Sequence, residues 1–159
     1  MKITYEPIGE IHSPFENIEG MPIQPSGADD AQGEILIFPA HTGGLEGLDD
    51  FSHLILLYHF HRVTRVDLKV LPFLDAEPHG VFSTRAPTRP NPLGLSVVEL
   101  ESRNKNILRI KGVDILHGTP LLDIKPYVPE FDHFSGERIG WYSKSRGQST
   151  TKKSDDRFR

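Results

Sequence analysis

The alternation of apolar and polar positions along the chain mostly follows the two-residue period typical of β-strands. Strands are predicted on this basis at residues 3–7, 34–38, 53–61, 97–100 and 108–113. The last two flank a turn-like sequence at 103–106 and are predicted to form a hairpin. Helix is limited to a turn near 45–51 and a weak one around Trp141. We therefore predict a mainly β protein, a small single-domain β-barrel with long loops and little helix.

Length and composition fit one soluble domain. A chain of 159 residues can bury a sizeable core but is short for two ordinary domains. We predict a barrel domain at residues 1–142 and a polar, mobile tail at 143–159, with a long loop at 13–33. No apolar run reaches membrane length and no signal-peptide core follows Met1, so a cytoplasmic protein is expected. The absence of cysteine excludes disulfides and thiolate chemistry.

Charge is distributed unevenly along the chain, although its net value is −4. Residues 1–50 carry one Lys or Arg and ten Asp or Glu, whereas residues 81–111 carry six basic and two acidic residues. A local basic patch on an acidic protein can bind RNA without general association with polyanions. The alternative interpretation is an ordinary solvated face.

The segment 80–96, GVFSTRAPTRPNPLGLS, is the most restricted part of the sequence. Its closely spaced prolines exclude helix and stiffen the backbone, so Arg89 and Asn91 are expected to project from a pre-ordered ribbon. Arg89 is predicted to be exposed, and Gly94 is predicted to permit a sharp turn into the following apolar run. The alternative is a rigid turn without a function.

A second restricted segment, LHGTPLLDIKPY at 116–127, completes a specific resemblance. The two segments, with IHSPF at 11–15 and GLDDFSHL at 47–54, resemble the TrmO (TsaA, YaeB) family from about residue 5 to 129. Members are similar to S-adenosylmethionine-dependent tRNA methyltransferases that act on N6 of threonylcarbamoyladenosine, just 3′ of the anticodon. The resemblance implies a tRNA partner and a homodimer, and it implies neither membrane nor DNA binding.

By resemblance, the cofactor site is assembled from separated loops, and the sequence has no contiguous nucleotide-binding motif. The implied cofactor-binding residues are Ile23, Gln24, Pro25, His61, Arg62, Arg85, Leu95, Asp114, Ile115, Leu116 and His117. His117 stands where the family usually has Asp. The sequence also lacks the longer C-terminal domain of bacterial members, which leaves the manner of tRNA docking open.

Four polar residues are the candidates for catalysis: Asp123, Lys125, Arg89 and Asn91. Asp123 and Lys125 alternate with apolar residues, so both are expected to project from one face of a strand. Methyl transfer from a sulfonium mainly needs alignment and water exclusion, and a carboxylate or histidine would assist by accepting the N6 proton. Arg85 or Arg89 could hold the threonyl carboxylate by a bidentate contact.

Two alternatives to the methyltransferase remain open. The first is a non-catalytic nucleoside- or RNA-binding barrel that lost its chemistry with the change at His117. The second is a metallohydrolase, since His53, His59 and His61 share one strand face, but structural histidines are favoured and no metal site is predicted.

Overall fold

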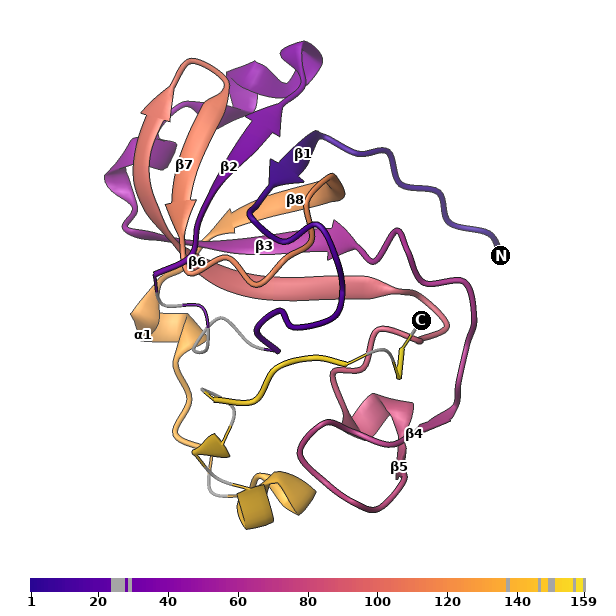
Figure 1. The fold of residues 1–159 in the computed structure, drawn as a ribbon. Helices are drawn as coiled ribbons and strands as arrows, with labels where there is room; N and C mark the ends of the chain where they lie inside the picture. The colour runs from indigo at the N-terminus through magenta and orange to yellow at the C-terminus, as the bar shows by residue number, and fades with distance from the viewer. Residues whose placement is uncertain are drawn as a thin grey trace.

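The computed structural model describes residues 1–23, 28, 30–136, 138–145, 147–148, 151–155 and 157–158. Gln24 and Pro25 therefore lie outside the described residues. Six antiparallel strands form a closed barrel in the order β1-β2-β7-β6-β3-β8 (Figure 1). The strands are β1 (Gly9–His12), β2 (Gln32–Ile37), β3 (His53–His59), β6 (Leu93–Asn104), β7 (Ile107–Lys111) and β8 (Thr119–Pro126). The prediction of a mainly β barrel with little helix is confirmed.

Alternate residues of these strands fill the barrel interior. In β3 the inward residues are Leu54, Leu56 and Tyr58, at most 5% exposed, while the outward residues are only half-buried. The predicted strand at 53–61 is thus present but buried on one face. The predicted hairpin is β6–β7, whose turn places Lys105 at φ 55°. Because the interior is filled by apolar side chains, the barrel itself offers no channel for a ligand.

Short elements connect and flank the barrel. The 3-10 helices are η2 (Pro39–Leu45), η3 (Leu48–Asp50), η4 (Val81–Ser83) and η5 (Gly140–Ser145), and α1 is Pro129–Asp132. Two-residue strands β4 (Lys69–Val70) and β5 (His79–Gly80) pair outside the barrel, below it in Figure 1. No helix in the described part of the chain is long and apolar enough to cross a membrane.

The chain between β3 and β6 builds a second, smaller apolar cluster next to the barrel. Val70, Val81 and Ala86 pack there with Phe158, which is 6% exposed and comes from the C-terminal end. Ser154 donates a hydrogen bond to the carbonyl of Ile18, which belongs to the N-terminal segment after β1. The described part of the predicted tail therefore contacts the body of the protein, and its mobility stays a prediction.

Two local predictions are wrong. Residues 3–7 form no strand: Ile3 and Tyr5 are 66% and 67% exposed, because β1 begins only at Gly9 and occupies the place between β2 and β8. Gly94 does not make a turn but lies inside β6, opposite Tyr58. A Cβ atom there would lie 2.1 Å from Cε2 of Tyr58, so glycine is needed for the close approach of that ring.

Candidate active site

The proline-rich segment between β5 and β6 is stiffened by Arg89 as well as by its prolines. The Arg89 guanidinium donates from Nη1 to the carbonyl of Thr84 at 2.8 Å and reaches those of Val81 and Ala86 at 3.3 Å. The side chain is half-buried, so the prediction that it is exposed is wrong. A guanidinium that closes its own loop in this way stabilises the loop directly.

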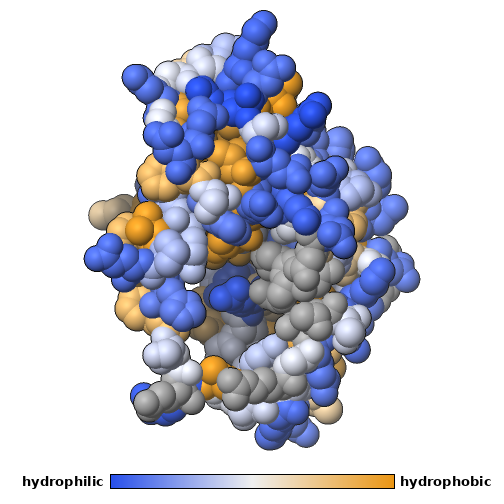
Figure 2. Space-filling model, turned by 90° about the vertical axis from the view of Figure 1, so that its left-hand side faces the viewer, coloured by the Kyte–Doolittle hydropathy of each residue, from blue (hydrophilic) through white to orange (hydrophobic). Residues whose placement is uncertain are grey.

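This segment forms one wall of a cavity of about 390 Å³ at the end of the barrel. The other walls come from the end of β3 and the residues after it, the start of β6, residues 113–116, and parts of the N- and C-terminal segments. Figure 2 shows one face of the molecule hollowed below the barrel, with hydrophobic side chains above the hollow. The cavity thus combines segments that are far apart in the sequence.

The cavity brings together most of the residues that the resemblance implied for cofactor binding. Those that line it are Ile23, His61, Arg62, Arg85, Leu95, Asp114, Ile115 and Leu116. His117 is not among the lining residues. Its ring stacks on that of His12 at 5.0 Å, and Nδ1 lies 3.2 Å from the carbonyl oxygen of Ser13. His117 therefore holds the loop after β1.

Asp114 is a carboxylate of the cavity wall, and it ends a hydrogen-bonded chain that starts inside the barrel. The hydroxyls of Tyr58 and Ser96 lie 3.0 Å apart, and Ser96 donates to Oδ1 of Asp114 at 2.7 Å. Burial raises the pKa of Asp114 to about 6, against the opposing effects of the Ser96 hydrogen bond and the Arg85 charge. Burial also raises the pKa of Tyr58, so its hydroxyl stays protonated. Sequence reasoning missed Tyr58 and Ser96, because the pairing of β3 with β6 that brings them together cannot be seen in the local pattern.

His61 comes two residues after the end of β3 and also lines the cavity. Its Nδ1 is 3.4 Å from the Thr119 hydroxyl, a long contact. Burial first, and then the charges of Arg62 and His59, lower the pKa of His61. The ring is therefore neutral at pH 7. No group of three metal-ligating side chains is found within the described ranges.

Three of the four catalytic candidates do not line the cavity. Asp123 and Lys125 project together from β8 as predicted, with Nζ and Oδ2 2.7 Å apart, but on the outer face of the barrel. Asp123 is in register with Leu57 of the neighbouring strand, and neither residue lines the cavity. Asn91 is exposed, and only Arg89 is a lining residue.

The basic residues of the segment 81–111 are partly neutralised by the acidic N-terminal third. Arg103 forms an ion pair with Asp49, and Arg109 pairs with Glu34. Lys111 also lies 3.6 Å from a carboxylate oxygen, that of Asp30. The predicted basic patch is therefore smaller than the sequence count suggests.

A closed six-stranded barrel with a loop-built, partly apolar cavity at its end defines a small-ligand-binding β-barrel. The family model of the tRNA-methyltransferase O N-terminal domain matches residues 10–133, and the chain belongs to this family. The resemblance seen in the sequence is thereby confirmed.

Relatives and solved structures agree with this assignment. The chain is 54% identical over 158 residues to a probable S-adenosyl-L-methionine-binding protein of Pyrococcus abyssi, covering 99% of this chain and 86% of that one. It is 39% identical over 136 residues to the human tRNA (adenine(37)-N6)-methyltransferase, covering 80% of this chain but 30% of the human protein. The crystal structure of TrmO from Pseudomonas aeruginosa matches with a TM-score of 0.75 and 40% identity, covering 89% of this chain and 63% of that one.

Proposed function

We propose that this protein is an S-adenosylmethionine-dependent methyltransferase that modifies N6 of an adenosine next to the tRNA anticodon. The observation that carries the proposal is the cavity, which gathers eight residues implied by the family resemblance from five separate segments of the chain. The names of the Pyrococcus and human relatives support the cofactor and the reaction.

The cavity suits such a cofactor in size and chemistry. Its volume of about 390 Å³ falls in the range of roughly 300–1,000 Å³ typical of small-molecule sites. Leu93, Leu95 and Ile115 offer apolar contacts, and Asp114 supplies a negative charge for a cationic ligand. S-adenosylmethionine, when bound, would supply an electrophilic methyl group on its sulfonium sulfur.

The residues of this chain would then align the acceptor and handle its proton. Because the pKa of Asp114 is near 6, its carboxylate is mostly ionised at pH 7 and can still take up a proton readily. We therefore assign Asp114, rather than Asp123, as the acceptor of the N6 proton. Ser96 holds the carboxylate in place, and the neutral His61 adds no competing positive charge.

We further propose that the adenosine that is methylated is threonylcarbamoyladenosine. Arg85, an exposed arginine on the cavity wall, would hold the threonyl carboxylate. Asp123, Lys125 and Asn91 do not line the cavity, and the catalytic role predicted for them stays a prediction.

We also propose that the protein is a cytoplasmic homodimer. The outer faces of β3 and β6 carry apolar residues, among which Leu93 and Leu95 are 45% and 52% exposed. Leu57 and Val97 continue this surface and are half-buried. Leu93 and Leu95 also line the cavity, so a second copy that covers this apolar surface would close one side of the cavity. Light scattering would measure the mass.

The test is methyl transfer to matched tRNA transcripts with and without the threonylcarbamoyl group, followed by mass spectrometry of the nucleosides. N6 methylation of the modified transcript is expected, with much slower reaction on the unmodified one. Equal rates would contradict the role of Arg85, and absence of any transfer with normal cofactor binding would favour the non-catalytic barrel. That alternative lost its main support because His117 lies off the cavity wall.

A further inference from the structure

A second cavity, of about 730 Å³, adjoins the first. The two share the wall formed by Thr84, Arg85 and Pro87, and Phe158 also lines both. A ligand in the second cavity would therefore lie next to a ligand in the first.

The second cavity is unusually aromatic. Its lining includes Phe73, Phe82, Trp141, Tyr142 and Phe158. Phe82 is 77% exposed, which is a large apolar surface to leave in water. Trp141 and Tyr142 lie beyond residue 133, where the match to the family model ends.

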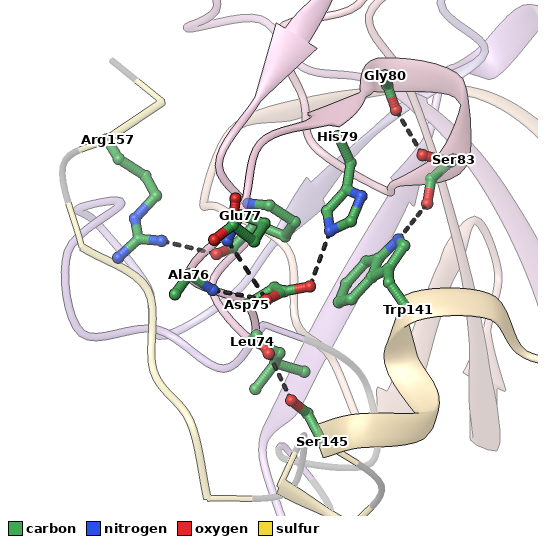
Figure 3. A network of polar contacts seen from close by, with 11 residues as sticks. Leu74, Asp75, Ala76, Glu77, His79, Gly80, Ser83, Trp141, Ser145 and Arg157 are labelled. Carbon is green, nitrogen blue, oxygen red and sulfur yellow. Dashed lines mark hydrogen bonds and ion pairs between the residues drawn. The ribbon is translucent and has the colours of Figure 1, made fainter.

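A polar network holds the Trp141 wall in position (Figure 3). The Trp141 ring stacks on the His79 imidazole, with centroids 5.1 Å apart and planes at 17°, and its Nε1 donates to the carbonyl of Ser83 at 2.8 Å. His79 is in turn bonded to Asp75 at 2.8 Å, and both side chains are at most 22% exposed. Ser145, in the same 3-10 helix as Trp141, donates to the carbonyl of Leu74. The wall is therefore fixed at both ends before any ligand arrives.

Charge in this cavity favours an anionic or nucleotide ligand. Among the described residues that line it, Arg85 is the one that carries a charge, and no carboxylate is present. Aromatic side chains combined with arginine are the means by which proteins bind unstacked bases of single-stranded RNA. The volume of the second cavity, about 730 Å³, is also large enough for a base with a bulky N6 substituent.

We propose that the second cavity receives an unstacked purine base of an RNA loop and presents its N6 edge to the first cavity. Phe82 and Trp141 provide the stacking surfaces, and Arg85 on the shared wall contacts the anionic substituent or the adjacent phosphate. The proposal rests on the proposed function, because it places the acceptor of that reaction.

The single tryptophan gives a direct readout, since Trp141 is the only one in the chain. A tRNA anticodon stem-loop with adenosine 3′ of the anticodon is titrated while tryptophan fluorescence and RNA anisotropy are recorded. Quenching is expected, and it should be lost when that adenosine is replaced by an abasic nucleotide. Quenching that is equal for the abasic loop would overturn the proposal.

Variants separate the cavity from the rest of the surface. Phe82→Ala is expected to weaken stem-loop binding about 5- to 100-fold, the usual range for removing one base-stacking aromatic residue. Phe134→Ala, which removes a phenylalanine that is 82% exposed and lines neither cavity, is the matched control and should bind normally. Trp141→Phe keeps an aromatic wall and should bind within a few-fold of the wild type.

Calorimetric titration with S-adenosylmethionine distinguishes the two proposals. Phe82 does not line the first cavity, so Phe82→Ala should bind this cofactor with unchanged affinity. Unchanged RNA affinity and turnover in Phe82→Ala would overturn the base site while leaving the proposed function intact. A wild-type protein that binds no cofactor would instead contradict the proposed function. Protein-concentration-dependent fluorescence without RNA would show that the cavity is covered by a second copy, and this would also overturn the base site.

Discussion

Replacement of Asp114 by asparagine is expected to change how stability depends on pH. Burial raises the pKa of Asp114 from 3.8 to about 6 in the folded protein, a difference worth about 3 kcal/mol in full. Because the folded state binds this proton more tightly than the unfolded state, the wild-type protein gains stability as pH falls through 6 toward 3.8. Asparagine cannot titrate, so Asp114→Asn lacks this gain.

The expected magnitude follows from the two pKa values. Between pH 8 and pH 5 the wild type should gain about 1.4 kcal/mol relative to Asp114→Asn, since one full unit of the shift is realised by pH 5. Urea unfolding of both proteins at these two pH values measures the difference, and other titrating groups cancel because they are common to both. At pH 8 the variant should be the more stable protein, since it buries no charge.

Two further measurements test the raised pKa of Asp114. In Ser96→Ala the carboxylate loses the hydrogen bond that favours its ionised form, so the inflection of the stability curve should move to higher pH. The methyl-transfer rate of the wild type should fall below about pH 6, where Asp114 takes up its proton. A stability difference between wild type and Asp114→Asn that is the same at both pH values, within about 0.5 kcal/mol, would show that the carboxyl is not desolvated.

Three further substitutions test the packing around the site by thermal and urea unfolding. Gly94→Ala should lose about 1–3 kcal/mol and weaken cofactor binding, because the new methyl group would displace the Tyr58 ring; an unchanged melting temperature would show that the ring moves freely. Arg89→Ala should lose roughly 1.5–3 kcal/mol, and normal stability with lost turnover would restore the interpretation of Arg89 as an exposed catalytic group. Thr88→Val should gain about 1 kcal/mol, because the buried Thr88 hydroxyl has no hydrogen-bond partner among the described residues; a loss would point to a bound water.

The parts of the fold that were predictable from the sequence are those set by local pattern. The β6–β7 hairpin follows from alternating residues on both sides of a short turn, and its two strands meet without help from distant segments. Residues 3–7 show the same alternation and form no strand. Alternation indicates that a segment is able to pair as a strand. Whether it does so depends on a free strand edge, and here β1 already occupies the place between β2 and β8.

The chemistry of the site was less predictable because it depends on contacts between distant residues. The pKa of Asp114 depends on burial by the barrel end and on Ser96, 18 residues away. The neutralisation of Arg103 by Asp49 requires a contact across 54 residues. Arg89 illustrates a different limit, since a short-range pattern of prolines suggested an exposed side chain while the same tight turn brought backbone carbonyls within its reach.

Substitutions in the two cavities are expected to affect folding stability and RNA binding differently, because the cavities differ in their relation to the barrel core. The first is built partly from the barrel's own residues, since Tyr58 and Ser96 are buried in the core, and Tyr58 is linked to Asp114 through the Ser96 hydroxyl. Changes there should alter folding and activity together. The second cavity is built from the segment between β3 and β6 and from the helix of Trp141, which pack beside the barrel. Because the barrel closes without them, substitution of an exposed residue such as Phe82 should affect binding of RNA while the unfolding transition stays where it is. Such a difference is expected where a rigid barrel supports loops that carry the binding residues.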